Sequence, residues 1–270
     1  MRLRYSQTLR FSGTDLRNVS VRTPLAAEHY AKGLACHSDH PMKIFTKKGN
    51  IFGQISFSSL PARVVHWEVE ISVRTIKEAD PGRHWGNMEE YSPVDIQRYC
   101  QSEAFWEVGA DAIQKTAHRI SLGSDGNIYD LVRKTFAFVQ QSIVVPEAQK
   151  DRFGALRTLA RGLGDCDEFS DLFITILRAL RIPARRITGV FVKGHQAEPH
   201  AWAEILLPRS SSRWLTMDPA LGFFGRRSQY HFGRKIESTI STRSDIAVQW
   251  KGKKSARVQI SVIPPDLLEA

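Results

Sequence analysis

The chain has 270 residues, of which 42% are hydrophobic, so it can bury the core of one catalytic-sized domain together with a smaller unit. It contains no apolar run of about 18 residues, the length that a membrane-spanning helix requires, and its basic N-terminus lacks the apolar core of a secretory signal peptide. The three cysteines, Cys36, Cys100 and Cys166, are an odd number without metal-ligand spacing. This pattern indicates a reducing compartment, and we expect a cytoplasmic location.

The formal net charge is +10, and part of the excess lies in residues 226–257, near the C-terminus. A basic surface of this kind attracts anionic lipid, nucleic acid or an acidic protein. Because no nucleic-acid-binding motif accompanies the basic residues, nucleic acid is disfavoured. A solvated basic face and an acidic partner both remain open.

The first 90 residues have the pattern of a β domain. Residues 1–24 are weakly patterned with room for an opening strand, and residues 25–33 form either a short helix or an extended piece. Residues 42–57 predict a hairpin that turns at Lys47-Lys48-Gly49-Asn50, since Gly and Asn tolerate left-handed backbone angles. Residues 63–73 alternate between apolar and polar side chains and predict a long strand.

Helical patterns follow a polar, turn-rich linker that we place at residues 77–93. Helix is expected after Tyr91 towards Cys100, again to Ile120, from Ile128 to Val139, and briefly at residues 155–159. The clearest helix begins at Cys166, after a glycine-containing loop. Its apolar residues recur at helical spacing, and Ile182-Pro183 ends it. The apolar stripe consists of Phe169, Leu172, Phe173, Ile176, Leu177 and Leu180.

Two strands come next, at residues 199–207 and 214–219, and they carry His200 and Asp218. Past them, Gly222 to Gly225 is turn-like, and His231 is interpreted as structural or exposed. A last alternating strand covers residues 256–262, and Pro264-Pro265 is expected to end the ordered chain.

Cys166, His200 and Asp218 together fit thiol catalysis. A helix N-terminus lowers the pKa of a thiol, whereas the neighbouring Asp165 and Asp167 raise it, so Cys166 requires a cationic partner to become a thiolate. An imidazole supplies that partner, and a carboxylate orients the imidazole. Each residue alone is more often structural; the three in this order and context point to catalysis.

These motifs resemble the transglutaminase-like superfamily, with its Cys at a helix N-terminus, its His-Ala-Trp strand (His200-Ala201-Trp202) and its Asp-Pro strand end (Asp218-Pro219). The resemblance is dense over residues 127–225. It implies an α+β, papain-like core with an antiparallel sheet, preceded by an N-terminal antiparallel β domain. The domains expected are 1–90 (β domain), 91–225 (catalytic core) and 226–270 (basic extension with a final strand).

The activity that the resemblance implies is acyl chemistry on peptide or carboxamide bonds of a protein or peptide substrate. Hydrolysis of the thioester intermediate is expected, with protein cross-linking by acyl transfer, or a non-catalytic interaction module that retains the fold, as alternatives. The backbone N–H of Cys166 would meet the oxyanion. The second donor is open, and the candidates for it or for the site wall are Gln140, Gln141, Tyr129 and Trp202. No cofactor and no metal are expected, because the sequence contains neither nucleotide-binding motifs nor clustered metal ligands.

Overall fold

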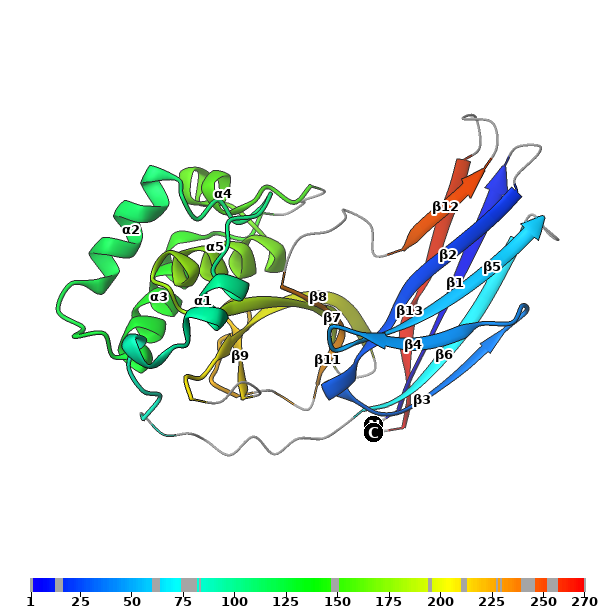
Figure 1. The fold of residues 1–270 in the computed structure, drawn as a ribbon, viewed down its shortest axis with the longest axis horizontal. Helices are drawn as coiled ribbons and strands as arrows, with labels where there is room; N and C mark the ends of the chain where they lie inside the picture. The colour runs from blue at the N-terminus through cyan, green and yellow to red at the C-terminus, as the bar shows by residue number, and fades with distance from the viewer. Residues whose placement is uncertain are drawn as a thin grey trace.

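The computed structural model describes residues 2–12, 17–59, 64–73, 82, 84–146, 151–193, 196–209, 213–226, 228, 230–238, 246–251 and 257–269. Within these ranges the chain forms a group of helices, a central antiparallel sheet beside them, and a two-sheet β unit on the far side of that sheet (Figure 1). The predicted α+β class, with helices packed beside an antiparallel sheet, is confirmed.

The β unit consists of two four-stranded sheets, ordered β13-β1-β6-β3 and β12-β2-β5-β4. Lys48 and Gly49, with φ of 51° and 74°, make the predicted hairpin turn between β4 and β5. The segment left open at residues 25–33 is a strand end, the short 3₁₀ helix η1 (Glu28–Tyr30) and a new strand. The N-terminal strands are β1 (Arg2–Ser12), β2 (Arg17–Ala27), β3 (Ala31–Ser38), β4 (Lys43–Lys47), β5 (Asn50–Ser59) and β6 (Val64–Val73).

The C-terminal strands complete the N-terminal β unit instead of forming a separate extension. Strand β12 (Ala247–Lys251) pairs with β2, and β13 (Arg257–Glu269) pairs with β1 along its length. The pairing of Arg2 with Glu269 brings the two ends of the chain side by side (Figure 1). The expected boundary at 226–270 is therefore corrected, because sheet pairing joins the two ends of the sequence.

The prolines at 264 and 265 were expected to end the ordered chain, but β13 continues through them to Glu269. Proline lacks the N–H that a central strand needs, but β13 lies at the edge of its sheet. The register shift opposite Arg4 and Ser6 coincides with this stretch. An edge strand tolerates proline here because one side of it has no neighbouring strand to hydrogen-bond.

Part of the predicted linker, residues 77–81 and 83, lies outside the described residues, and the short 3₁₀ helix η2 (Met88–Glu90) closes the remainder. The expected helices follow it. None of the helices in the described ranges is long and apolar enough to cross a membrane. They are α1 (Pro93–Tyr99), α2 (Asp111–Ser121), α3 (Ile128–Ser142), α4 (Ala155–Arg161) and α5 (Cys166–Ala179).

Helix α5 begins with a reciprocal cap. The Asp165 side chain accepts a hydrogen bond from the backbone N–H of Asp167, and the Glu168 carboxylate accepts one from the backbone N–H of Asp165 at 3.1 Å. This capping box satisfies N–H groups that the first turn of a helix leaves without partners. A Cβ on Gly164 would lie 2.2 Å from the Cβ of Glu168, so only glycine permits this entry into the helix. The local sequence thus fixes where the helix starts and places Cys166 in its first turn.

The central sheet has the order β10-β9-β8-β7-β11, and its strand pairings among the described residues are antiparallel. Strand β11 belongs to this sheet although it lies beyond the core boundary expected at residue 225, so the core extends further along the sequence than expected. The strands are β7 (Ala184–Lys193), β8 (Gln196–Leu206), β9 (Trp214–Asp218), β10 (Phe223–Phe224) and β11 (His231–Glu237).

Each face of the central sheet is covered by a different hydrophobic core. Ala203, Ile205 and Met217 join the helical core, together with Leu172 and Phe173 of α5. On the other side, residues of β7, β8 and β11 join the core of the β unit, among them Ile187, Trp202 and Phe232. Because alternate residues of a strand point to opposite faces, one sheet holds the two halves of the molecule together.

Candidate functional site

Cys166 is the first residue of α5 and is half-buried, with its sulfur against β8, where the backbone N–H of Ala201 hydrogen-bonds to it. Ala201 follows His200 directly on β8, so the helix start and the histidine strand meet at the sulfur. The helix position follows from the capping box, whereas the contact with β8 arises from packing of α5 on the sheet.

The electrostatic surroundings of the thiol favour its neutral form. Burial, followed by the charges of Asp167 and Asp165, raises the pKa of Cys166 to about 12, and the Ala201 N–H and the Arg186 charge only partly oppose this. The thiol is therefore protonated at neutral pH. A nucleophilic sulfur at that pH requires a base that accepts the thiol proton during the reaction.

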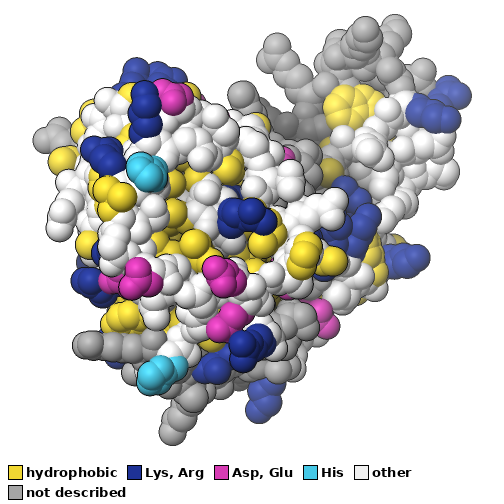
Figure 2. Space-filling model, turned by 60° about the vertical axis from the view of Figure 1, so that its left-hand side comes forward, with side chains coloured by type: hydrophobic (Ala, Val, Ile, Leu, Met, Phe, Trp, Pro, Cys, Tyr) yellow, Lys and Arg dark blue, Asp and Glu magenta, His cyan; other side chains and the backbone are white. Residues whose placement is uncertain are grey.

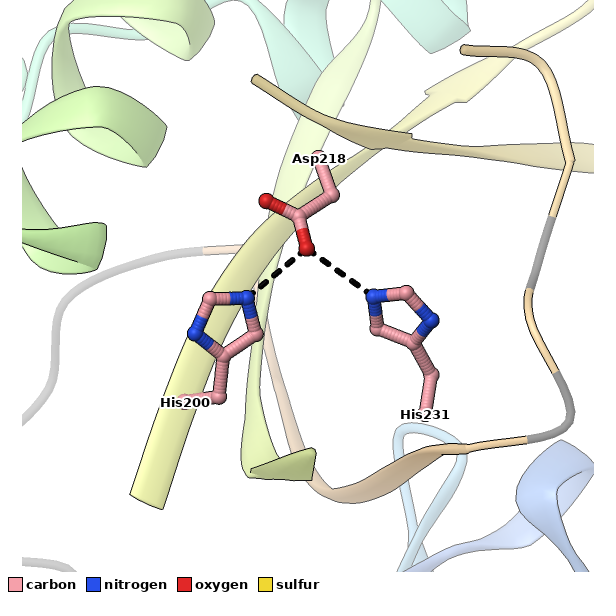
Figure 3. Close-up of side chains that lie close together, drawn as sticks. All are labelled: His200, Asp218 and His231. Carbon is pink, nitrogen blue, oxygen red and sulfur yellow. Dashed lines mark hydrogen bonds and ion pairs between the residues drawn. The ribbon is translucent and has the colours of Figure 1, made fainter. Parts of the chain in front are cut away.

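His200 and Asp218 form the base and its orienting group. Nε2 of His200 lies 2.7 Å from Oδ2 of Asp218 (Figure 3). Oδ1 of the same carboxylate accepts a hydrogen bond from the backbone N–H of Leu221 at 3.1 Å. Burial alone would raise the pKa of Asp218, but the hydrogen bonds from His200 and His231 outweigh it and lower the pKa to about 2. The carboxylate is thus an acceptor at neutral pH, so His200 carries its proton on Nε2 and keeps Nδ1 as an acceptor.

Cys166 and His200 line the same cavity, of about 870 Å³. Its walls include Asp165, Asp167 and Arg186, so both signs of charge border it. A chain segment or side chain of a substrate could reach the sulfur from this cavity, whereas Asp218, fully buried, lies behind His200.

Arg186 ties the start of α5 to the edge strand of the sheet. Its guanidinium forms ion pairs with Asp167 and, at 2.7 Å, with Glu237 on β11. Asp171, one helical turn further along α5, is fully buried and receives two hydrogen bonds of 2.6 Å from Arg152. Buried charges are costly unless paired, so these pairs fix the cavity wall around Cys166 in one arrangement.

His231 is buried beside the site. The sequence analysis interpreted this residue as structural or exposed. Its Nε2 lies 2.9 Å from Oδ2 of Asp218, the same oxygen that His200 contacts (Figure 3). Sequence reasoning missed this contact because His231 follows Asp218 by 13 residues, with a turn between them. Only the pairing of β11 with β7 carries it back to the carboxylate.

Trp202 connects the site to the N-terminal β unit. Its ring stacks on His200, with centroids 5.9 Å apart, and its Nε1–H donates to the hydroxyl of Tyr30 at 2.9 Å. Tyr30 belongs to η1 and donates in turn to Glu204 at 2.8 Å. Trp202 is therefore a wall behind the imidazole that the N-terminal half of the chain helps to hold.

The other three candidates from the sequence lie away from the cavity. Gln140, Gln141 and Tyr129 are not among the described residues that line the cavity, and neither is Trp202. Gln140 donates to the carbonyl of Pro219 at 3.1 Å and so supports the turn after Asp218, and Gln141 is exposed. Tyr129 packs edge-on against Trp85 and Phe224. The backbone N–H of Cys166 stays the predicted oxyanion donor, and the second donor stays open.

Two groups of side chains in the described ranges bring potential metal ligands within 4.8 Å of one another: His200, Asp218 and His231, and Asp165, Cys166 and Asp167. In the first group both imidazoles already bond to one carboxylate oxygen at hydrogen-bond distance. In the second, Asp165 caps the helix and Asp167 pairs with Arg186. Hydrogen bonding thus accounts for both arrangements.

The basic residues near the C-terminus lie in different environments. Lys235 is buried and pairs with Glu237 at 2.8 Å, Arg234 borders the cavity, and Arg226 and Lys251 are exposed. Arg227, Arg243, Lys253 and Lys254 lie outside the described residues. On the face seen in Figure 2, basic side chains stand among acidic and apolar ones. An acidic partner for this region stays a prediction.

Comparison with known proteins places these features in context. Residues 114–219 match the family model of the transglutaminase-like superfamily, and this range includes α3 to α5, Cys166, His200 and Asp218. A solved structure named "Putative Cysteine Protease" from Cytophaga hutchinsonii has 15% sequence identity and a TM-score of 0.62, over 99% of this chain and 92% of that one. The fold, including the β unit, is therefore shared over the whole chain.

Two further similarities are partial. The periplasmic domain of TgpA from Pseudomonas aeruginosa has 14% identity and a TM-score of 0.42, over 79% of this chain and 88% of that one. The uncharacterized protein YebA of Bacillus subtilis is 24% identical over 160 residues, 51% of this chain. The match covers 20% of the length of YebA, so the present chain corresponds to a minor part of that relative.

Proposed function

We propose that the chain is a cysteine-dependent enzyme that cleaves peptide or carboxamide bonds through an acyl-enzyme, and the match of residues 114–219 to the transglutaminase-like superfamily model supports this. The observation that carries the proposal is one cavity bordered by both Cys166 and His200, with Asp218 bonded to Nε2 of the imidazole and Nδ1 left as an acceptor. Cytoplasmic location belongs to the same proposal, on the ground of three free cysteines.

The reaction begins with transfer of the Cys166 thiol proton to Nδ1 of His200 as the sulfur attacks the carbonyl carbon. The carbonyl oxygen becomes an oxyanion and meets the backbone N–H of Cys166 at the start of α5. His200 then gives its proton to the leaving amine, and a thioester forms on Cys166. In hydrolysis His200 takes a proton from water, which attacks the thioester, and returns that proton to sulfur when the carboxylic acid leaves.

Asp218 stabilises the imidazolium that exists between these steps. Because its pKa is about 2, it stays ionised throughout the neutral range and accepts a hydrogen bond from the Nε2–H of His200. The raised pKa of Cys166 makes this base essential, since the thiol yields little thiolate on its own.

Transfer of the acyl group to an amine, giving protein cross-linking, is the second candidate. One observation favours it: the carboxylates of Asp165 and Asp167 border the cavity beside the sulfur. Asp167 is paired with Arg186, so the Asp165 carboxylate, which caps the helix, is the charge that would attract a cationic lysine side chain. Hydrolysis remains the first choice, because water needs no dedicated acceptor site.

Alkylation by iodoacetamide at pH 7, followed for each cysteine by mass spectrometry, tests the proposal. Cys100 is a matched internal control, because it is also half-buried and burial raises its pKa to about 12 as well. We expect Cys166 to react roughly 100-fold faster than Cys100 or more, the range for an adjacent general base. His200→Ala should remove the difference.

Equal alkylation rates at Cys166 and Cys100 in the wild type would overturn the proposal in favour of a non-catalytic module. A fast alkylation rate at Cys166 that is unchanged in His200→Ala would do the same. If the difference is seen, peptide substrates with and without a primary amine separate the two candidate reactions. Hydrolysis gives a free carboxylate, whereas transfer gives the amine adduct, and Cys166→Ala should abolish both.

A further inference from the structure

Oδ2 of Asp218 is bonded by two imidazoles at once, and the proposed reaction uses only one of them. His200 approaches from β8 at 2.7 Å and His231 from β11 at 2.9 Å, from opposite sides of the carboxylate (Figure 3). The His231 side chain is 0% exposed, so it cannot touch a substrate in the cavity. Any effect it has on the reaction must therefore pass through its neighbours, and Asp218 is the one to which it hydrogen-bonds.

Rigid aromatic packing holds the His231 ring in place. The rings of Phe191, Trp202 and Phe223 lie 4.9–5.0 Å from it, centroid to centroid, each at a steep angle. Trp202 also stacks on His200, so one indole packs against both imidazoles. A ring enclosed in this way keeps its Nε2 aimed at the carboxylate.

The backbones of β7 and β11 approach each other closely beside His231. Gly189 of β7 pairs with His200 on one side and with Gly233 on the other. A Cβ on Gly189 would lie 1.9 Å from the carbonyl oxygen of Phe232, so β11 can approach this closely only because residue 189 is glycine. The residue before Phe232 is His231, which the approach brings to Asp218.

We propose that His231 is a positioning residue: it holds Asp218 so that the carboxylate keeps His200 in the Nε2–H form with Nδ1 available for the Cys166 proton. This inference rests on the proposed function. Within the described part of the chain, the carboxylate accepts from the two imidazoles on Oδ2 and from the Leu221 N–H on Oδ1. Without His231 the carboxylate can rotate about its Cβ–Cγ bond, and the orientation of the His200 proton is no longer fixed by one oxygen.

Two substitutions separate hydrogen bonding from packing. His231→Phe retains an aromatic ring for Phe191, Trp202 and Phe223 but has no donor. His231→Gln has an amide N–H₂ near the place of the imidazole Nε2 and retains the donor. We expect His231→Phe to slow alkylation of Cys166 about 10- to 100-fold, the range for losing a hydrogen bond that orients a functional histidine. His231→Gln should restore most of the rate.

Imidazole ¹⁵N spectra supply a readout that stability alone does not move. In the wild type both His200 and His231 should carry a proton on Nε2, and in His231→Phe the His200 signals should become those of a tautomer mixture. Equal alkylation rates in the wild type and in folded His231→Phe would overturn the inference. So would a wild-type His231 whose Nε2 carries no proton, and this test holds even if His231→Phe does not fold.

Failure of the inference is distinguishable from failure of the proposed function. If wild-type Cys166 shows no His200-dependent reactivity, the proposed function fails before His231 is considered. If that reactivity is present and His231→Phe leaves both it and the His200 tautomer unchanged, only the positioning role fails.

Discussion

Replacing Asp218 by asparagine removes the charge that both imidazoles share, and its cost can be worked from the structure. Burial opposes ionisation of Asp218, but its hydrogen bonds to His200 and His231 lower the pKa from 3.8 to about 2. Each tenfold change in proton affinity corresponds to about 1.4 kcal/mol, so the ionised carboxylate contributes about 2 kcal/mol to the free energy of unfolding at neutral pH.

The sign of the pH dependence follows from the lowered pKa. A group of this kind stabilises the native state above its unfolded pKa of 3.8, and the contribution is lost as the pH falls towards 2. Roughly half of it, about 1 kcal/mol, should disappear between pH 7 and pH 3. Asp218→Asn lacks this titration, so the gap in stability between wild type and variant should narrow by that amount over the same interval.

Urea unfolding followed by tryptophan fluorescence at a series of pH values measures the gap. Asp111→Asn, at a side chain 81% exposed on α2, controls for loss of one negative charge. A gap between wild type and Asp218→Asn that stays constant or widens towards pH 3 would refute the assignment of Asp218 as the buried anion of the site. Cys166 alkylation in the same variant should fall with the loss of the His200 orientation.

Two further substitutions test how the site is held. Gly189→Ala places a Cβ 1.9 Å from the carbonyl oxygen of Phe232, so we expect a loss of about 1–3 kcal/mol or more in urea unfolding. Gly109→Ala, whose Cβ would meet nothing within 4 Å, should change stability little; equal effects of the two would contradict the close approach of β7 and β11. Tyr30→Phe removes the hydroxyl that accepts from Trp202 and donates to Glu204, and should cost about 1–3 kcal/mol because the buried indole N–H loses its acceptor. Tyr230→Phe, at a side chain 44% exposed, is its control, and an equal loss there would argue against the link between the β unit and the site.

The local elements of the site could be predicted from the sequence alone. The spacing of apolar residues after Cys166 predicted α5, and the Asp165–Glu168 pair that caps it is readable within four positions of the chain. Lys48-Gly49 likewise specified its turn, because few residues adopt positive φ. The order of Cys166, His200 and Asp218, each in a matching context, was sufficient for the resemblance that the family model supports.

Tertiary structure decided what depends on pairs distant in sequence. The final strand pairs with β1, and its edge position lets it run through Pro264 and Pro265. Neither outcome can be predicted from the local propensity of the residues. Burial raises the pKa of Cys166 more than the Ala201 N–H and the Arg186 charge lower it, and burial is a property of packing. His231 reached Asp218 through the register of β11 against β7, which a close glycine contact permits. Side-chain periodicity reports which face of an element is buried, whereas the neighbour across that face is set by how the whole chain packs.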